Sequence, residues 1–432
     1  MATIRQRDSK VIWHPYTPMK IWPEAIAIVK GEGVYLIDED GNRYIDAISS
    51  WWVTLHGHSH PYIAEKVSKQ LTVLEHCIFA GFTHEPAVTL AERLLDILPQ
   101  GMSKIFYSDN GSTAVEVAIK MSLQYWNNKG IKKKKLVALE NAYHGDTFGA
   151  MAVSGRSVFT EAFTDLLFDV SFVPFPSKGN EQQSIDALET LLKTGKVAAF
   201  IVEPLVQGSA GMMMYSPDTL EQYFQLCKKY DALIIDDEVM TGFGRTGPLF
   251  ACDHISTQPD IVCLSKGLTG GSMPLGITAC AQHIFDAFYD DDRMKTLYHG
   301  HSFTANPIMC TAALASLDLV LDDACTKSRD QIAEAHKTFA AGIHDHPLIG
   351  DIRQTGTIIA IELKTGITSY HNNLRDELYR FFLGKRIVMR PLGNIIYILP
   401  PYCITIAELE YIYGCIKELL YELQAKQASP TH

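Results

Sequence analysis

The sequence predicts an α/β protein, with a mainly parallel β-sheet covered by helices on both faces and a smaller α+β domain beside it. Two patterns predict this fold. Between about residues 60 and 305, short apolar runs alternate with amphipathic stretches, as in parallel sheets that are buried on both faces. Before and after that region, the chain changes to hairpin-like and mixed segments, which indicates a second, smaller folding unit.

The elements are expected in the following order. The first fifty residues should form strands and turns, with a hairpin at Asp40-Gly41-Asn42. Residues 104–126 predict a strand, a turn and a long helix. Further helices are expected in residues 60–77, 184–195, 216–231 and 306–323. Further strands are expected in residues 134–141, 197–204, 231–238 and 260–267, and residues 351–363 and 387–405 mix strands and helices.

The domain organisation follows from the changes in pattern. A chain of 432 residues is long enough for two or three domains. Residues 55–305 should form the large domain, and residues 306–432 should form the small C-terminal domain. Residues 1–54 are expected to join the small domain.

The composition excludes several classes of protein. The formal charge of −11 argues against a nucleic-acid binder that is held by phosphate contacts. No apolar run is long enough for a membrane span, and the N-terminus shows no apolar region of a secretory signal. The nine cysteines are scattered and form no CxxC pair, so we expect reduced thiols, a cytoplasmic location and no metal site.

Residues 108–116 end a strand and open a helix. Gly111 permits a tight turn, Ser112 and Thr113 bring hydroxyls, and Thr113 and Glu116 have the spacing of a capping box. A helix N-terminus with free N–H groups is a ready phosphate site. Plain helix capping is the alternative, and the motif alone does not decide between them.

Two further strand ends carry ionisable residues. Three acids, Asp236, Asp237 and Glu238, follow an apolar strand, where a carboxylate could bind a metal, pair with a protonated ring nitrogen or cap a helix. Lys266 closes the next buried strand, and burial lowers the pKa of such an amine, which suits reaction with a carbonyl carbon. An exposed loop lysine is the alternative.

Together these signals predict a site for pyridoxal phosphate. This cofactor needs a phosphate cup, an acid facing its ring nitrogen and a lysine that bonds to its aldehyde carbon. Asp237 and Lys266 stand one strand–connection–strand step apart, so both could face one ring. Tyr143 follows the strand in residues 134–141 and could cover that ring, although an ordinary core aromatic would look the same.

The motif DDEVMTGFGRTGPLFACDH, at residues 236–254, and SKGLTGGSMPLG, at residues 265–276, carry a specific resemblance. Along nearly its whole length the chain resembles the class III, fold-type I, pyridoxal-phosphate-dependent aminotransferases. The resemblance is greatest to members that move an amino group from S-adenosylmethionine to 8-amino-7-oxononanoate, giving 7,8-diaminononanoate for biotin biosynthesis. It is carried by five stretches: Trp13 to Pro18, Ser49 to Trp52, Tyr143 to Met151, Met389 to Gly393 and Leu399 to Tyr402.

The resemblance implies roles for single residues. Lys266 would hold the cofactor covalently and move the proton, and Asp237 would keep the ring nitrogen protonated. Gly111 and Ser112 would hold the phosphate, and Tyr143 would stack on the ring. Gly300, His301 and Ser302 match a segment that reaches the partner's phosphate in a homodimer. The substrates would contact Tyr16, Trp51, Tyr143, Lys266, Gly300 and Arg390, with Arg390 meeting the keto-acid carboxylate.

Some residues depart from the family pattern or have weaker readings. His301 stands where the family usually has proline, and the loop Ser154 to Ser157 also differs. Glu203 is expected to order the cofactor network, and Arg245 to hold a loop or touch the donor. A loop or channel role is favoured over a metal for His56, His58 and His60.

Alternatives to this function remain open. The amino donor could be lysine, or the chain could be a general ω-amino acid aminotransferase of the GABA or ornithine type. An aminomutase would keep the amine on one carbon skeleton. A cofactor-binding regulator without catalysis is a third alternative, and the intact lysine, acid and arginine argue against it.

Overall fold

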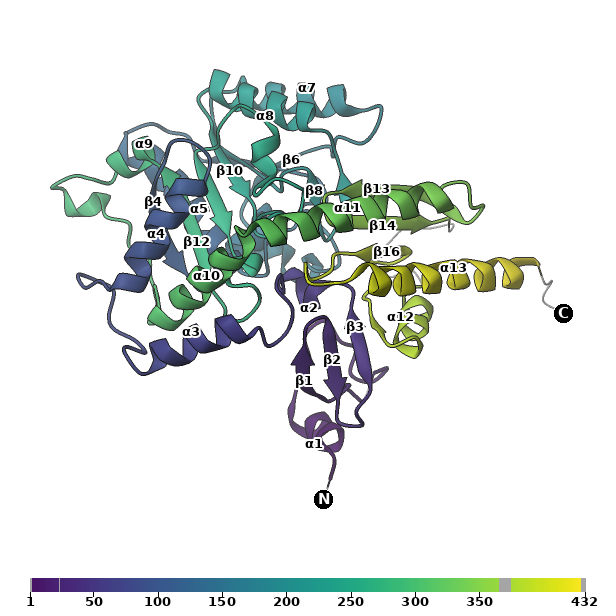
Figure 1. The fold of residues 1–432 in the computed structure, drawn as a ribbon. Helices are drawn as coiled ribbons and strands as arrows, with labels where there is room; N and C mark the ends of the chain where they lie inside the picture. The colour runs from purple at the N-terminus through teal and green to yellow at the C-terminus, as the bar shows by residue number, and fades with distance from the viewer. Residues whose placement is uncertain (1, 23, 365–373, 429–432) are drawn as a thin grey trace.

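The computed structural model describes residues 2–22, 24–364 and 374–428 of the chain. Its centre is a seven-stranded sheet with the order β4-β12-β11-β10-β7-β5-β6 (Figure 1). Its strands are β4 (Met102–Ser108), β5 (Lys135–Leu139), β6 (Val170–Val173), β7 (Val197–Val202), β10 (Leu233–Asp237), β11 (Ile261–Leu264) and β12 (Gly276–Ala281). Only β12 runs antiparallel to its two neighbours. The prediction of a mainly parallel sheet is confirmed.

Helices cover both faces of this sheet because successive strand residues point to opposite sides. In β7, Ala199 and Ile201 pack towards α5 (Gly111–Asn128), whereas Phe200 and Val202 pack towards α7 (Glu181–Leu192) and α8 (Pro217–Lys229). Figure 1 shows α7 and α8 at the top of the molecule. A third cluster packs α4 (Glu85–Ile97) and α10 (Pro307–Val320) against β11 and β12.

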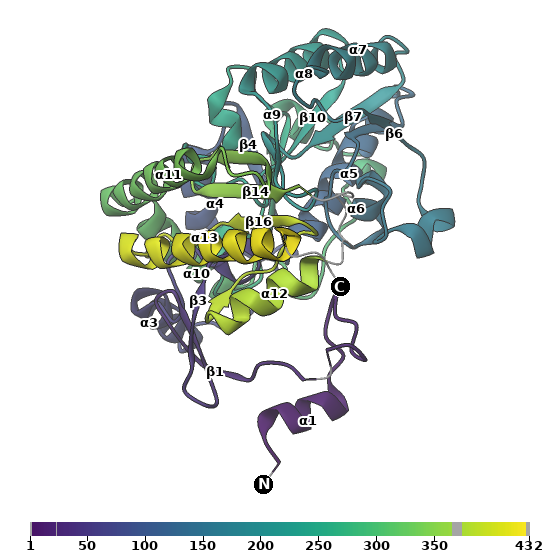
Figure 2. The same cartoon turned by 90° about the vertical axis from the view of Figure 1, so that its right-hand side faces the viewer.

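Two smaller sheets lie outside this layer. β13 (Ile349–Thr355), β14 (Ile358–Leu363) and β16 (Ile395–Ile398) form an antiparallel sheet. The long helices α11 (Asp323–Ile343) and α13 (Ile406–Ala428) lie side by side (Figures 1 and 2). The helix α12 (Leu374–Gly384) leads into β15 (Ile387–Val388). The domain boundaries stay a prediction.

The N-terminal hairpin pairs with the C-terminal part of the chain. β2 (Tyr35–Asp38) and β3 (Arg43–Asp46) form the expected hairpin, with β1 (Ile28–Glu32) on one side. On the other side, β15 runs parallel to β3. The sheet therefore joins segments more than 300 positions apart.

Short elements complete the chain. They are α2 (Ser49–Trp52), α3 (Pro61–Leu71), α6 (Phe148–Val153), η1 (Glu161–Leu166), β8 (Val206–Gln207), β9 (Met213–Met214), η2 (Ala251–His254), η3 (Lys266–Thr269), α9 (Gln282–Asp286) and η4 (Arg293–Lys295). Among the described residues, no helix combines the length and apolar character that crossing a membrane requires.

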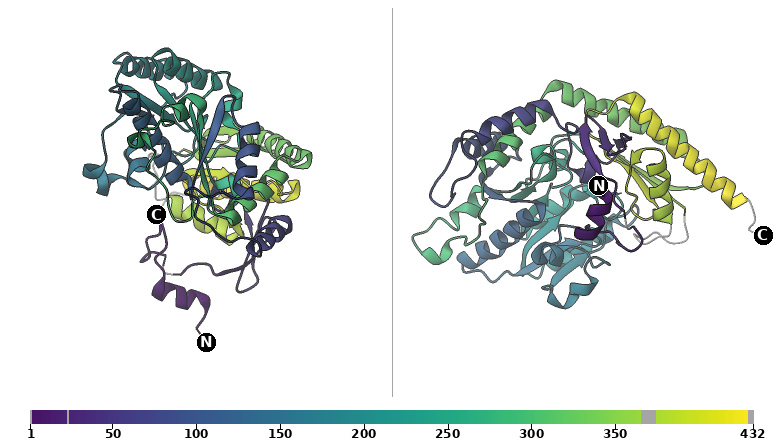
Figure 3. Two further views of the ribbon diagram at one scale, coloured as in Figure 1. Left: turned by 90° about the vertical axis from the view of Figure 1, so that its left-hand side faces the viewer. Right: turned by 90° about the horizontal axis from the view of Figure 1, so that it is seen from below.

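The expectation of only strands and turns in the first fifty residues is wrong. Residues Ile4–Val11 form the helix α1, which the left view of Figure 3 shows at the lower edge of the molecule. Thr3 and Gln6 form its capping box. α1 buries none of its residues, so it has no apolar face that a periodicity search could find. Likewise, the helix expected in residues 60–77 ends at Leu71.

Candidate active site

A cavity of about 680 Å³ lies where β10 and β11 end and α5 begins. Ligands of open α/β sheets bind at this edge, beyond the carboxyl ends of the strands. The cavity is lined by five of the predicted residues: Gly111, Ser112, Tyr143, Asp237 and Lys266. Residues from four separate stretches of the sequence therefore meet in one place.

Lys266 begins η3, directly after the buried strand β11. Its Nζ lies 4.5 Å from the centroid of the Trp52 ring, which places the amine against an aromatic face. Burial lowers the pKa of Lys266 to about 8, although Asp237 and Glu203 oppose that shift. A lysine with this pKa is partly neutral near pH 8 and can act as a nucleophile.

Asp237 ends β10 and forms a hydrogen bond with His144, for which the sequence predicted no role. Its Oδ2 lies 2.6 Å from His144 Nδ1, and its Oδ1 accepts a hydrogen bond of 3.2 Å from the Val239 N–H. Asp237 and His144 are both buried. His144 therefore holds the carboxylate in one orientation, whereas the sequence predicts a role only for the neighbouring Tyr143.

The N-terminus of α5 forms the third side of the cavity. Asn110 caps the helix by accepting from the Thr113 N–H, at 2.9 Å. The backbone packs tightly here, since a Cβ on Gly111 would lie 2.6 Å from Val239 Cγ1 and one on Gly145 would lie 2.8 Å from Ser112 Cα. Gly145 also has a φ of +133°, which favours glycine. This packing fixes the first turn of the helix at the cavity, and such a turn can bind an anion through its N–H groups.

Tyr143 is fixed at the cavity through its backbone. Its N–H donates to Glu203 Oε1 at 2.9 Å, and Glu203 Oε2 accepts from the Gly208 N–H at 3.0 Å. Burial raises the pKa of Glu203 to about 7 and raises that of Tyr143 above its usual value. Glu203 therefore orders the loop that carries Tyr143, and its expected part in a cofactor network stays a prediction.

Tyr16, Trp51 and Arg390 do not line this cavity. They contact one another next to Tyr143 and form a separate wall there. The Tyr16 and Tyr143 hydroxyl oxygens lie 3.4 Å apart, and the Tyr16 hydroxyl donates to Asp146. The Tyr16 and Trp51 rings meet edge to face at 5.4 Å between centroids. The Arg390 guanidinium lies 4.9 Å from the Trp51 ring centroid, and it donates to the Tyr16 carbonyl oxygen at 3.1 Å.

The turn that carries Trp51 is conformationally strained. Ser49, Ser50 and Trp52 have φ of 52°, 60° and 66°, a region that residues other than glycine rarely adopt. Hydrogen bonds from Ser50 N to Asp46 Oδ2 at 2.6 Å and from Trp52 Nε1 to Tyr397 Oη at 3.0 Å hold it. The turn buries Trp52 beneath Lys266 and leaves Trp51 exposed in the wall.

Gly300, His301 and Ser302 lie in the described part of the chain but do not line this cavity. The loop that contains them is attached to α5, because Lys120 Nζ donates to the Tyr298 carbonyl oxygen at 3.2 Å. The loop from Ser154 to Ser157 borders a neighbouring cavity of about 420 Å³, which Tyr143 also lines.

Arg245, His56 and His58, for which the sequence predicted loop or channel roles, contact other residues of the protein. Arg245 is buried and donates to the Pro400 carbonyl oxygen at 2.7 Å, which fits a structural role. His56 Nε2 lies 3.0 Å from Ser316 Oγ, and burial lowers the pKa of His56 to about 3. His58 Nε2 lies 2.9 Å from Asp46 Oδ2.

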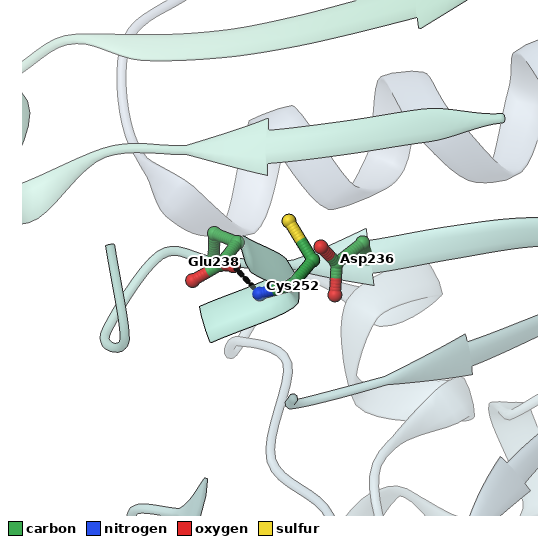
Figure 4. Close-up of side chains that lie close together, drawn as sticks. All are labelled: Asp236, Glu238 and Cys252. Atoms are coloured by element: carbon green, nitrogen blue, oxygen red, sulfur yellow. Dashed lines mark hydrogen bonds between the residues drawn. The ribbon is translucent and has the colours of Figure 1, made fainter. Parts of the chain in front are cut away.

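Asp236, Glu238 and Cys252 are three potential metal ligands whose atoms lie within 4.8 Å of one another. Figure 4 shows the Glu238 carboxylate bonded to the Cys252 backbone nitrogen, at 2.8 Å. Burial raises the pKa of Glu238 to about 7 and raises those of Asp236 and the Cys252 thiol well above their usual values. Metal binding would require these groups to lose their protons.

Comparison with known proteins places the chain in one family. The profile of the family "Aminotransferase class-III" matches residues 18–420. The adenosylmethionine-8-amino-7-oxononanoate aminotransferase of Synechococcus elongatus is 46% identical, over 95% of this chain and 99% of the relative. The enzyme of that name from Geobacter sulfurreducens is 40% identical, over 97% of each chain.

Solved structures agree with the sequence comparison. The crystal structure of the enzyme of the same name from Methanocaldococcus jannaschii has a TM-score of 0.91 and 36% identity, and the match covers 96% of this chain and 98% of that one. An omega transaminase from Pseudomonas jessenii, in complex with PMP, also has a TM-score of 0.91, at 27% identity over 98% of each chain.

Proposed function

Since the chain belongs to the class-III aminotransferase family and has its fold, we propose that it moves an amino group from S-adenosylmethionine to 8-amino-7-oxononanoate. The product is 7,8-diaminononanoate, an intermediate of biotin synthesis. The names of the relatives from S. elongatus and G. sulfurreducens contain both substrates and support this proposal. The observation that carries it is the wall of Tyr16, Trp51 and Arg390 beside Tyr143.

Pyridoxal phosphate is the proposed cofactor, and the cavity has the groups that it needs. The first turn of α5, at Gly111 and Ser112, would hold the phosphate through backbone N–H groups. Asp237 would keep the ring nitrogen protonated, and Tyr143 would lie against the ring. When bound, the cofactor supplies an electron sink for the substrate carbon that loses its proton.

Lys266 carries the reaction through its Nζ. The amine would hold the cofactor covalently, and its lowered pKa makes the neutral, nucleophilic form available near pH 8. Nζ would also be the group that takes the proton from the donor carbon. The same atom would return a proton when the keto acid is aminated, so the two substrates would react in turn.

The wall of Tyr16, Trp51 and Arg390 selects the keto acid. Arg390 binds its carboxylate with a planar fork of donors, and the rings of Tyr16 and Trp51 line its aliphatic chain. Gly300 does not line the cavity of its own chain, and it would contribute to the substrate site of the partner subunit from the loop that precedes α10.

We further propose a cytoplasmic homodimer in which Gly300, His301 and Ser302 reach the partner's cofactor phosphate. The exposed side chains of Tyr298 and Phe303 in that loop support a contact with a second copy. In this arrangement residues 55–305 form the cofactor domain, while residues 1–54 and 306–432 form the small domain.

A general ω-aminotransferase is the second candidate function. It is favoured by the structural likeness to the P. jessenii omega transaminase, which matches as well in TM-score as the M. jannaschii enzyme does. The fold alone therefore does not choose between them.

Product analysis separates these candidates. The purified protein, loaded with pyridoxal phosphate, is incubated with 8-amino-7-oxononanoate and one donor at a time: S-adenosylmethionine, lysine or GABA. We expect 7,8-diaminononanoate with S-adenosylmethionine. Turnover with lysine alone would change the donor, and turnover of GABA with other keto acids only would favour the general enzyme.

A further inference from the structure

Ser112, Thr147 and Glu116 form a chain of hydrogen bonds at the α5 side of the cavity. Ser112 and Glu116 are four residues apart on α5 and share one face of the helix. Ser112 Oγ lies 2.7 Å from Thr147 Oγ1, which lies 2.5 Å from Glu116 Oε1. The Thr147 N–H also donates to Ser112 Oγ, at 3.0 Å.

The direction of the protons in this chain follows from the acceptor at its end. An ionised carboxylate can only accept, so the single Thr147 hydroxyl proton goes to Glu116 Oε1. Thr147 Oγ1 must then accept from Ser112, and the Ser112 hydroxyl proton points at Thr147. The Ser112 oxygen is thereby held in place at the edge of the cavity that Gly111 and Ser112 line.

Glu116 also ties the loop that covers the cavity to α5. Its Oε1 accepts two further hydrogen bonds, from the Gly149 N–H at 2.7 Å and the Ala150 N–H at 3.0 Å. Both donors lie in the first turn of α6, which packs beside α5 (Figure 2). Tyr143 and Gly145, which line the cavity, lie just before this attachment point.

We propose that Glu116 is a positioning residue for the phosphate end of the cofactor site, and that it acts through Thr147 on Ser112. This inference rests on the proposed use of pyridoxal phosphate. Glu116 does not line the cavity, so it touches neither the ring nor the aldehyde. The three hydrogen-bond donors stabilise the negative charge of the Glu116 carboxylate, so this charge can lie close to an anionic phosphate.

Two pairs of variants test the proposal. Glu116→Ala removes the acceptor of three hydrogen bonds, whereas Glu116→Gln keeps a carbonyl oxygen that can accept all three. Thr147→Val breaks the chain in the middle, whereas Thr147→Ser keeps the hydroxyl. Each variant without cofactor is titrated with pyridoxal phosphate and with pyridoxal, which lacks the phosphate. Bound ligand is followed through the absorbance of the lysine-bound form.

The ratio of the two affinities is the informative quantity. We expect Glu116→Ala and Thr147→Val to weaken the affinity for pyridoxal phosphate by about 10-fold or more, as for a lost hydrogen bond to a charged group. The affinity for pyridoxal should stay nearly unchanged. Glu116→Gln and Thr147→Ser should stay within about 3-fold of the wild type.

Other results would overturn the inference. An equal loss for both ligands, which leaves the ratio unchanged, would mean that Glu116 only supports the fold, and no loss for either ligand would mean that it has no part in phosphate binding. If Glu116→Ala does not fold, Thr147→Val decides. A wild-type protein that binds neither ligand would instead refute the proposed cofactor.

Discussion

His144 Nδ1 lies 2.6 Å from Asp237 Oδ2, and both side chains are buried beneath the candidate active site. A carboxylate can only accept, so His144 carries a proton on Nδ1. His144 thereby orients the Asp237 carboxylate, which lines the cavity and would face the ring nitrogen of the proposed cofactor. The second ring nitrogen of His144, Nε2, has no hydrogen-bond partner among the described residues.

Replacing His144 tests this orientation. His144→Leu removes the hydrogen bond to a charged acceptor, and we expect kcat/KM to fall by about 10- to 100-fold. His144→Asn, which keeps a side-chain N–H, should recover part of the loss. Steady-state rates and the cofactor absorbance spectrum of both variants give the answer. Equal rates in His144→Leu and the wild type would show that Asp237 needs no such support.

The pH dependence of cofactor loading tests the pKa of Lys266. With a pKa of about 8, roughly a tenth of the amine is neutral at pH 7 and about nine tenths at pH 9. The rate at which cofactor-free protein bonds to pyridoxal phosphate should therefore rise from pH 7 to 9 and then level off. Stopped-flow absorbance measures this rate. A rate that still climbs tenfold per unit above pH 9 would indicate an ordinary lysine.

Arg390 should serve one substrate only. We expect Arg390→Met to raise KM for 8-amino-7-oxononanoate by about 10- to 100-fold, because a charged hydrogen-bond pair is lost. The reaction of the loaded protein with the donor alone should change little and serves as the internal control. An equal loss in both reactions would mean that Arg390 acts through Tyr16, whose carbonyl oxygen it binds.

Asp236 provides a prediction on stability. Burial and the neighbouring Glu238 raise the pKa of Asp236, so its contribution is full below its unfolded pKa of about 3.9 and is lost as the pH rises towards the folded value. Asp236→Asn matches the protonated side chain in shape and cannot lose a proton. Relative to the wild type, this variant should gain at least about 1 kcal/mol of unfolding free energy between pH 5 and pH 8.

Urea unfolding at both pH values measures this difference. Glu238→Gln is the comparison variant from the same cluster, and it should also gain stability over this range because burial raises the pKa of Glu238 to about 7. Parallel stability curves for Asp236→Asn and the wild type would mean that Asp236 is ionised in the folded protein.

The cavity residues that could be predicted from the sequence are those that a pattern in their own stretch of chain marks. Lys266 and Asp237 stand at the ends of apolar strands, where a charged side chain is conspicuous, and the family resemblance and the mainly parallel sheet are confirmed. His144 was missed as a partner because Asp237 lies 93 positions away in the chain. Such a pairing depends on the order of strands in the sheet, which periodicity does not give.

Other features could not be predicted from the sequence, for different physical reasons. The helix α1 buries no residue, so its capping box is the only feature in the sequence that indicates it. The strained turn from Ser49 to Trp52 is held by Asp46 and Tyr397, so no local propensity predicts which tryptophan lies under Lys266. The pairing of β15 with β3 likewise joins distant segments and cannot be found from either strand alone.

The most direct test of the whole account is the first half-reaction. Loaded protein is mixed with S-adenosylmethionine alone, and the absorbance of the lysine-bound cofactor is followed, with Lys266→Ala as the control that lacks this band. We predict that the band disappears with S-adenosylmethionine and returns when 8-amino-7-oxononanoate is added, while GABA has no effect. A band that GABA removes, and that 8-amino-7-oxononanoate fails to restore after S-adenosylmethionine, would contradict the account.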